Sequence, residues 1–304
     1  MIKTPLRYPG GKSKVADYLV ELFPDYKEYR EPFLGGGSVF LTAMQKNPDA
    51  QFVVNDLYYD LFCFWSCMMD RPKEVLGRVF TLKNSYKDGR ELYNFLISDL
   101  PRMRRSDAYG VAAYFFLLNR ITFSGTSLSG GYSDESFRKR LTESSIERLT
   151  DCGEFLKSID TGGFVGDDYT GKKGIITNND FSVTLTQQTA GILEKSVDDG
   201  DVFVFLDPPY YTAEDSGLYG ENGDLHKGFD HIRLKECLDD CNFRIMMTYD
   251  DCEYIRTLYK GYYIMPLEFT YGMRNVTSSA DMKGKEIIIS NYKIQDNSKS
   301  IQLF

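Results

Sequence analysis

An acid, two prolines and an aromatic ring follow one another where the sequence predicts the end of a strand. The apolar run 202–206 is typical of a buried strand, and Asp207, Pro208, Pro209 and Tyr210 come directly after it. Proline fixes its own backbone angle and has no N–H group, so Asp207 is held in one direction and the carbonyl of Pro208 stays available as an acceptor. Two acceptors beside a flat ring suit a planar group that carries an amine, because the acceptors take its protons while the ring stacks on its face. We interpret these four residues as a catalytic set, with a purely structural turn as the alternative.

A glycine turn after an earlier predicted strand suits close contact with a ligand. The stretch 29–33 brings Glu31 and Phe33 to the carboxyl end of that strand, and glycines follow at 35–37. Glycine lets the backbone approach a ligand closely, and the helix expected from about Ser38 offers its N-terminal amides.

Two further predicted strands also end in acids. The stretch 51–56 ends in Asp56, at a position that typically holds a ribose diol. The stretch 174–181 ends in Asp180, which could accept from an exocyclic amine, and Phe181, which could stack on a base. Together with the glycine turn, these strand ends predict a nucleoside-containing cofactor.

Two glycine-rich stretches approach phosphate-binding motifs without completing them. PGGKSK would need glycine where the sequence has Leu6, and no strand precedes it, so a P-loop is disfavoured. GGGSVF places Phe40 where a G-x-G-x-x-G motif has its third glycine, which makes a nicotinamide-dependent dehydrogenase the weaker alternative.

The elements that must position these residues alternate between strand and helix. Strands are predicted at 29–33, 51–56, 174–181, 201–209, 243–251, 262–271 and 285–292, and helices from about 38 and at 57–69, 108–119 and 143–158. This alternation predicts an α/β fold with a parallel, doubly wound sheet, whose ligands lie at the carboxyl ends of the strands. A Gly/Ser-rich loop is predicted at 120–137, and 295–304 is predicted to be a tail.

A helical segment interrupts the alternation and differs from the rest in charge. We predict one domain from 1–68 and 160–304, with an inserted helical lobe at 69–159. The lobe carries 15 Lys+Arg against 12 Asp+Glu, and ten of the 15 are arginines, whereas the remainder carries 21 against 32 and the whole chain has a net charge of -8. An arginine-rich lobe on an acidic body favours contact with a polyanion, although a solvated surface is the alternative.

Cysteine, histidine and hydropathy patterns bound the remaining possibilities. Six scattered cysteines fit reduced thiols in a cytosol, and a zinc site is disfavoured because the chain has only two histidines. The first residues lack a signal-peptide pattern, and no apolar run has the length of a membrane span. We therefore expect a cytoplasmic protein that requires neither metal nor membrane.

Eight motifs in order resemble one enzyme family. PLRYPGGKSK, EPFLGGGSVFL, ND at 55–56, LNRITFSG, NNDF, LDPPYY, FDH at 229–231 and KGKEIIISNY are similar to the motifs of the Dam-type, D12-class DNA adenine-N6 methyltransferases, in the α-group order. The resemblance spans nearly the whole chain. Ser124 stands where the family usually has asparagine, so the resemblance does not specify which DNA sequence is recognised.

The resemblance implies a Rossmann-like methyltransferase sheet with S-adenosylmethionine (AdoMet) as the cofactor, and it implies a role for each matching residue. The residues expected to bind the cofactor are Tyr8, Gly10, Lys12, Glu31, Phe33, Gly35, Gly37, Ser38, Asp56, Asp180 and Phe181. Asp207, Pro208, Pro209 and Tyr210 would hold an adenine that has been flipped out of the duplex. The residues expected near DNA in the target-recognition lobe are Asn119, Arg120 and Ser124, and the basic cluster Arg138, Lys139 and Arg140 beside the Gly/Ser-rich loop.

The expected function is site-specific transfer of a methyl group from AdoMet to adenine N6 in double-stranded DNA. Such an enzyme would work in the cytoplasm of a bacterial or phage-infected bacterial cell, and in a restriction-modification system its partner would be a cognate restriction endonuclease. The alternatives are methylation of RNA adenine, methylation of cytosine N4, and a DNA-binding relative without catalytic activity.

Overall fold

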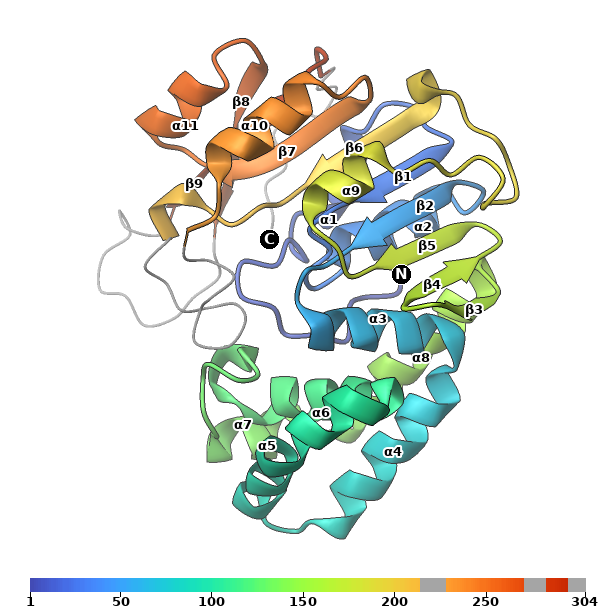
Figure 1. Cartoon of the computed structure of the whole chain (residues 1–304). Helices are drawn as coiled ribbons and strands as arrows, with labels where there is room; N and C mark the ends of the chain where they lie inside the picture. The colour runs from blue at the N-terminus through green and yellow to red at the C-terminus, as the bar shows by residue number, and fades with distance from the viewer. Residues whose placement is uncertain (214–227, 271–282, 295–304) are drawn as a thin grey trace.

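The computed structural model describes residues 1–213, 228–270 and 283–294, and the centre of this part of the chain is a nine-stranded sheet (Figure 1). Its strands lie in the order β3-β4-β5-β2-β1-β6-β7-β9-β8. Their bounds are β1 Glu28–Glu31, β2 Gln51–Asn55, β3 Gly162–Val165, β4 Asp168–Gly171, β5 Gly174–Thr177, β6 Val202–Leu206, β7 Arg244–Asp250, β8 Tyr263–Thr270 and β9 Lys283–Ser290. The predicted tail at 295–304 lies outside the described residues, as does the last residue of the strand predicted at 262–271.

Five parallel strands form the middle of the sheet, as the sequence predicts. β5, β2, β1, β6 and β7 pair in parallel, and β2 and β6 are buried at every position because helices cover both faces. The chain passes outward from β1 to β2 and β5, then returns to β6 on the other side of β1 and continues to β7. The strand order therefore reverses between β1 and β6, which is where ligands bind in folds of this kind.

The predicted parallel sheet is confirmed in its centre, whereas the strands at both edges pair antiparallel. β4 pairs antiparallel with β5 and with β3, and β9 pairs antiparallel with β7 and with β8. β3 and β4 were not predicted because their residues are mostly polar, small or exposed. They form a hairpin around Gly166, whose φ is +63°. Apolar runs such as β8 and β9 indicate strands but do not indicate their direction.

The helices are placed around this sheet as the alternation predicts. Their bounds are α1 Ala16–Glu21, α2 Ser38–Lys46, α3 Tyr59–Asp70, α4 Pro72–Ser85, α5 Gly89–Ser106, α6 Ala108–Ile121, α7 Asp134–Arg140, α8 Glu143–Ile159, α9 Phe181–Thr186, α10 His231–Asp239 and α11 Glu253–Leu258, with 3-10 turns at Phe123–Gly125, Asp199–Asp201 and Tyr211–Ala213. The helix predicted at 57–69 is α3, and the one at 143–158 is α8.

Alternate side chains of β6 show how the two faces of the sheet are packed. Phe203 and Phe205 belong to the core that contains α1, α2 and α3, whereas Val204 belongs to the core that contains α9, α10 and α11. Because successive side chains of a strand point to opposite faces, this apolar strand fills both cores at once. Burial on both sides fixes the position of its carboxyl end.

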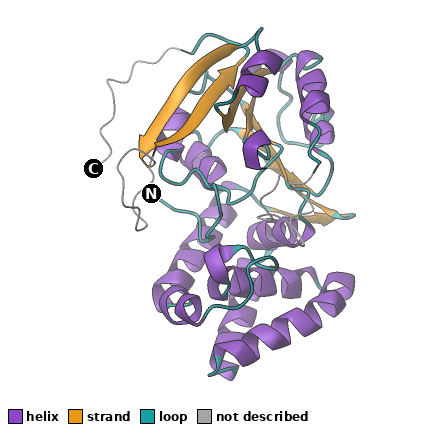
Figure 2. Ribbon diagram, turned by 90° about the vertical axis from the view of Figure 1, so that its left-hand side faces the viewer, coloured by secondary structure: helices purple, strands orange, loops and turns teal. Residues whose placement is uncertain are grey.

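Helices α4 to α8 gather on one side of the sheet in both views (Figure 1 and Figure 2). α6 lies in their middle, and all but its first residue are buried, as expected for an apolar helix. Arg104 of α5 donates to both carboxylate oxygens of Asp60 on α3, at 2.7 Å each, which joins this layer to the helix next to the sheet. The division into two domains at 68 and 160 stays a prediction.

The predicted loop at 120–137 is shorter than expected at both ends. α6 continues to Ile121, and α7 begins at Asp134 because Ser133 accepts from the backbone N–H of Ser136 as an N-cap. The basic cluster therefore belongs to the last turn of α7.

Among the described residues, no helix combines the length and apolar character needed to cross a membrane.

Candidate functional site

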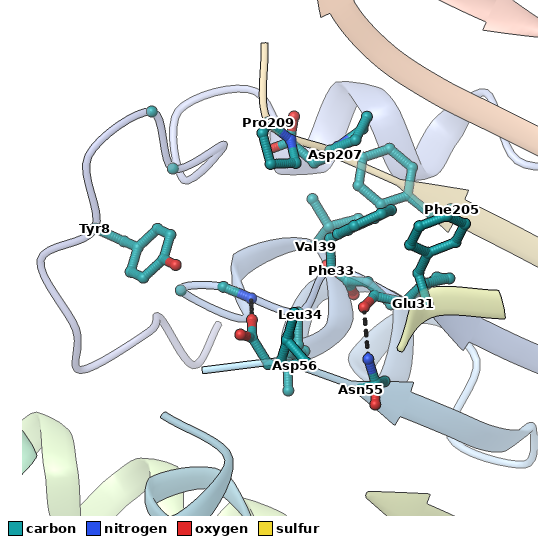
Figure 3. A pocket seen from close by; sticks show the side chains of 18 of the residues that line it. Tyr8, Glu31, Phe33, Leu34, Val39, Asn55, Asp56, Phe205, Asp207 and Pro209 are labelled. Atoms are coloured by element: carbon teal, nitrogen blue, oxygen red, sulfur yellow. Dashed lines mark hydrogen bonds between the residues drawn. The ribbon is translucent and has the colours of Figure 1, made fainter. Parts of the chain in front are cut away.

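A cavity of about 450 Å³ opens at the carboxyl edge of the parallel strands, beside the reversal between β1 and β6 (Figure 3). Every residue proposed from the sequence as cofactor-binding or catalytic lines it. The lining residues that the sequence analysis did not select are Pro9, Gly11, Pro32, Leu34, Gly36, Val39, Asn55, Leu57, Phe205, Gly228, Phe229, Asp230 and Arg233. Strand ends far apart in the sequence thus meet around one space.

The glycine turn after β1 has a shape that only glycine adopts easily. Gly35 and Gly37 have φ angles of +49° and +64°, in the left-handed region that side chains disfavour. A Cβ atom on Gly37 would also lie 2.4 Å from the ring of Trp65. The indole N–H of Trp65 donates to the carbonyl of Gly35 at 3.0 Å, and Ser38 begins α2 directly afterwards. Trp65 therefore holds the turn on the side away from the cavity, and the turn itself lines the cavity.

Tyr8 covers the same turn from the N-terminal segment. A Cβ atom on Gly36 would lie 2.8 Å from Cβ of Tyr8, so the two chains can pack this closely only with glycine. Gly11 closes a turn back to the carbonyl of Tyr8 at 3.0 Å, and Gly10 between them has a φ angle of +69°. Figure 3 shows the ring of Tyr8 lying apart from the other labelled residues, across the cavity from them.

Asp56, at the end of β2, is held by backbone N–H groups. Gly35 N–H donates to its Oδ2 at 2.8 Å (Figure 3), and Tyr58 N–H, which lies outside the cavity lining, donates to its Oδ1 at 2.9 Å. Burial raises the pKa of Asp56 to about 6, and these two hydrogen bonds act in the opposite direction. An acceptor fixed in this way beside a glycine turn suits a pair of vicinal hydroxyls.

Glu31 is a second acid in the cavity, and it is almost fully buried. The hydroxyl of Tyr29 donates to its Oε2 at 2.6 Å. Burial raises its pKa well above the ordinary value, and the negative charges of Asp207 and Asp56 act in the same direction. Burial therefore disfavours the charged form of Glu31, in contrast to the partly exposed Asp207.

Three phenylalanine rings form the wall at the other end of the cavity. The ring centres of Phe33 and Phe181 lie 5.6 Å apart, and Phe229 lies 5.7 and 5.8 Å from them. Phe229 belongs to the FDH stretch. Its place beside the other two rings was not predicted from the sequence. An apolar wall of aromatic rings suits a purine ring.

Asp180 caps α9 next to this wall, and it has a partner that the sequence analysis missed. Its carboxylate accepts from the backbone N–H of Ser182 at 3.0 Å and from both terminal nitrogens of Arg233, at 3.0 and 2.5 Å. The Arg233 guanidinium, through its hydrogen bonds, lowers the pKa of Asp180 to about 2. Arg233 comes from α10, and only its position after FDH could have drawn attention to it.

Asp207 leaves the end of β6 and meets two donors at once. The ammonium of Lys12 lies 2.9 Å from its Oδ2 and 2.8 Å from its Oδ1, and the hydroxyl of Thr248 donates to Oδ1 at 2.7 Å. Lys12 is 4% exposed, and it also lies 3.1 Å from the carbonyl of Gly10 and 3.7 Å from Glu286. The structure therefore places Lys12, expected at the cofactor, against the proposed catalytic acid.

The residues after Asp207 are held by aromatic and backbone contacts. The ring of Tyr210 lies parallel to that of Tyr249 at 5.9 Å, with the ammonium of Lys12 at 5.0 Å from its centre. The backbone N–H groups of Tyr211 and Thr212 donate to Asp250 at 3.1 and 3.0 Å. The acid that ends β7 therefore fixes the direction of the chain beyond the two prolines.

The residues predicted to lie near DNA do not line the cavity, and their burial differs. Asn119 is fully buried: its Oδ1 accepts from Arg7 N–H at 2.9 Å, and its Nδ2 donates to the carbonyls of Arg7 and Gly125 at 2.7 and 2.8 Å. Ser124 is half-buried with a φ angle of +53°. The basic cluster at the end of α7 is exposed.

Arg120 is a buried cation without an acidic partner in the described structure. It is 4% exposed, and its Nε and Nη2 atoms have no hydrogen-bond partner among the described residues. Burial lowers its pKa to about 9, and the positive charges of Arg7, Arg148 and Arg140 add to the effect. Arg7 of the N-terminal segment and Arg120, Arg140 and Arg148 of the helical layer thus act electrostatically on one another.

No group of three or more side chains suited to a metal ion occurs in the part of the chain that the structure describes. The described cysteines are free thiols, of which Cys63, Cys67 and Cys152 are buried. Burial raises the pKa of Cys63 to about 12.

Comparisons with known proteins agree in one assignment. Residues 8–166 and 172–273 match the family model of the D12 class N6 adenine-specific DNA methyltransferases. A Type II methyltransferase of Lactococcus lactis subsp. cremoris, M1.LlaDCHI, is 26% identical over 94% of this chain and 94% of its own length. A Type II methyltransferase of Methanocaldococcus jannaschii, M.MjaIII, is 22% identical over 96% of this chain and 99% of its own. The DNA N-6-adenine-methyltransferase of Escherichia phage P1 is 25% identical over 91% of this chain, which spans 34% of the phage protein. The family match covers the greater part of the chain in order, and the chain belongs to the D12 class of N6 adenine-specific DNA methyltransferases.

Proposed function

We propose that the cavity binds AdoMet and that Asp207, Pro208 and Tyr210 hold a flipped-out adenine of double-stranded DNA beside it. One observation carries this proposal: the DPPY residues and all residues expected at the cofactor line the same cavity. An enzyme that transfers a group directly between two molecules must bring them together in this way.

The lining of the cavity fits AdoMet in shape and in charge. Its volume of about 450 Å³ lies within the usual range for small-molecule sites. The phenylalanine wall and Asp180 would hold the adenine ring, and Asp56 would hold the ribose hydroxyls. The acids of the lining are Glu31, Asp56, Asp180, Asp207 and Asp230, and the bases are Lys12 and Arg233. An excess of acids favours a ligand that carries a sulfonium and an ammonium group.

The carboxylate of Asp207 has acceptor capacity left for an amine. Within the described residues, Oδ1 accepts from Thr248 and Lys12, whereas Oδ2 accepts from Lys12 alone. Each carboxylate oxygen has two lone pairs, so Oδ2 can accept one more hydrogen bond. The Pro208 carbonyl would supply the second acceptor. Thr248 and Lys12 hold the acid in place.

These acceptors address the chemical difficulty of the reaction. The lone pair of adenine N6 is conjugated with the ring, which makes the nitrogen a poor nucleophile. Acceptors on its two protons favour rehybridisation and stabilise the positive charge that develops on nitrogen. When bound, AdoMet supplies a methyl group activated by the sulfonium. Tyr210 would stack on the extruded base and hold it in plane.

The helical layer is the proposed DNA-binding lobe. The positive charges of Arg7, Arg140 and Arg148 act on Arg120, and a DNA phosphate near them would offset a buried charge that the described residues leave uncompensated. Because Asn119 is buried, we propose that it positions Arg7 and the turn at Gly125 for DNA without touching DNA itself. A partner endonuclease and a cytoplasmic location stay predictions.

Base analysis tests the proposed function directly. Purified protein, AdoMet with a labelled methyl group and duplex DNA should yield labelled N6-methyladenine, while an RNA of the same sequence should stay unlabelled. Label on cytosine or on RNA would replace the assigned substrate. Binding of AdoMet without any transfer to DNA, RNA or cytosine would favour the non-catalytic alternative.

A further inference from the structure

Arg233 is partly exposed, yet it contacts Asp180, Ser182 and Phe181 at the end of the cavity that is proposed to hold the adenine ring. Its Nη1 and Nη2 donate to the two oxygens of Asp180, at 3.0 and 2.5 Å, and its Nη2 also lies 3.1 Å from Ser182 Oγ. The guanidinium carbon lies 4.8 Å from the ring centre of Phe181. A planar cation that both grips the acid and covers the ring suits a role in shaping this end of the site.

The start of α10 fixes the place from which Arg233 reaches the cavity. Asp230 is the N-cap of this helix and accepts from the backbone N–H of Arg233 at 2.9 Å. Asp230 and the preceding Phe229 both line the cavity, so the cap and the wall come from adjacent residues. Arg233 also lines the cavity, although it is not one of the four DPPY residues.

The hydrogen bonds of Asp180 leave its carboxylate one site at which it can accept a further hydrogen bond. Among the described residues, its Oδ1 accepts from Ser182 N–H at 3.0 Å, Ser182 Oγ at 2.5 Å and Arg233 Nη2 at 2.5 Å, whereas Oδ2 accepts from Arg233 Nη1 alone. Each oxygen offers two lone pairs, so Oδ1 is saturated and Oδ2 keeps one acceptor site. A carboxylate that is held ionised can only accept, and it cannot rotate to offer a proton.

We propose that Arg233 is a positioning residue that makes the cavity select a purine with an amine at its 6-position over one with a carbonyl oxygen. This inference rests on the proposed AdoMet site and adds to it the residue that sets cofactor specificity. The Arg233 guanidinium keeps the pKa of Asp180 near 2, so the acid stays ionised at every pH at which the protein would work. A 6-amine donates to such an acceptor, whereas a 6-oxo group meets it with a second lone pair and is repelled.

Solvent exposure limits how large this effect can be. The side chains of Asp180 and Arg233 are 40% and 44% exposed, so water screens their attraction and can solvate the acid when the arginine is removed. We therefore expect Arg233 to act through the fixed orientation of Asp180. Its loss should reduce the preference between the two purines from at least about tenfold to within about threefold, and it should not abolish binding.

The test compares two probes on variants of the full chain by calorimetry. S-adenosylhomocysteine and S-inosylhomocysteine differ at the 6-position and need no catalysis to bind. The parent should bind the amine form at least about tenfold more tightly, and Arg233→Gln should bring the two affinities within about threefold of each other. Arg233→Lys keeps the charge but cannot donate to both carboxylate oxygens from a planar fork, so its preference should lie between the two.

Arg256→Gln is the matched control. Arg256 makes a similar exposed pair with Asp251, through nitrogen–oxygen distances of 2.5 and 3.0 Å, but neither residue lines the cavity. This variant should keep the parent's preference. If Arg233→Gln weakens both probes equally, or leaves their ratio unchanged, the specificity role is wrong while the cofactor site stands. If the folded parent binds neither probe, the proposed cofactor site is wrong and the inference fails with it. Thermal unfolding of each variant separates these outcomes from loss of the fold.

Discussion

Replacement of Asp207 by asparagine removes its charge and hardly changes its size. The parent carboxylate accepts from Lys12 at 2.9 and 2.8 Å and from Thr248 at 2.7 Å. In Asp207→Asn the amide oxygen can still accept from these two donors, which turns the amide NH2 group toward the target amine. Two N–H groups then face each other where the reaction needs an acceptor. The variant should therefore fold and lose catalysis.

The size of the effect follows from the role proposed for the acid. Loss of one preorganised partner of the developing charge typically slows a reaction by about 10²–10³-fold, or about 2.7–4 kcal/mol. Asp207→Ala should reach a similar rate but should be less stable, since Lys12 is 4% exposed and would lose its nearest acceptor. An unpaired buried donor costs about 1–3 kcal/mol. The asparagine variant separates the catalytic effect from this structural one.

Single-turnover transfer with labelled AdoMet and excess enzyme is the assay, because it reports the chemical step apart from product release. Binding of AdoMet and of duplex DNA should stay within about threefold of the parent, as the proposed binding residues for both lie mainly elsewhere. Transfer by Asp207→Asn at the parent rate would refute the proposed acceptor role. A slow rate that tracks weakened AdoMet binding would instead assign Asp207 to the cofactor.

Three further predictions address the cofactor site, the DNA surface and the glycine turn. Burial raises the pKa of Asp56 to about 6, and the proposed contact with the ribose hydroxyls needs the ionised acid, so AdoMet affinity should fall by up to about tenfold for each pH unit below 6. Asp56→Asn should remove this pH dependence, as measured by calorimetry. An unchanged pH dependence would exclude Asp56 as the titrating group. Alanine at Arg138, Lys139 and Arg140 together should flatten the dependence of log DNA affinity on log salt by about one unit for each DNA phosphate that is no longer neutralised, and an unaltered slope would mean that the cluster is only solvated surface. Gly37→Ala should lower the free energy of unfolding by at least about 1–2 kcal/mol, because φ is +64° and Trp65 lies 2.4 Å from the new Cβ, and a parent-like melting temperature would contradict this.

The site was predictable from the sequence where strand ends carry the chemistry. Asp56, Asp180 and Asp207 each follow an apolar run, and in a parallel sheet such positions meet at one edge. Their convergence needed only the alternation of strands and helices. Arg233 and Thr248 could not be found in this way, because a cation on a helix and a hydroxyl inside a strand gain their meaning only from which acid they reach.

The edges of the sheet and the layer of helices were less predictable for a related reason. Strand direction depends on which neighbour an edge strand meets, and β9 inserts between β7 and β8, a choice that local pattern does not encode. Asn119 was expected to lie near DNA, and the structure shows it buried, with hydrogen bonds to Gly125 and to Arg7, which is more than a hundred residues away. Contacts between distant segments decide whether such a polar residue faces outward or holds the fold together.

The N-terminal segment connects the two parts of the proposed mechanism. Arg7 is held by Asn119 of the helical layer, Tyr8 packs on the glycine turn, and Lys12 reaches Asp207, all within six residues. The carbonyl of Arg7 also lies so close to Gly125 that a Cβ there would approach it to 2.7 Å. The segment therefore contacts the proposed DNA-binding layer, the glycine turn proposed to bind the cofactor and the proposed catalytic acid in succession.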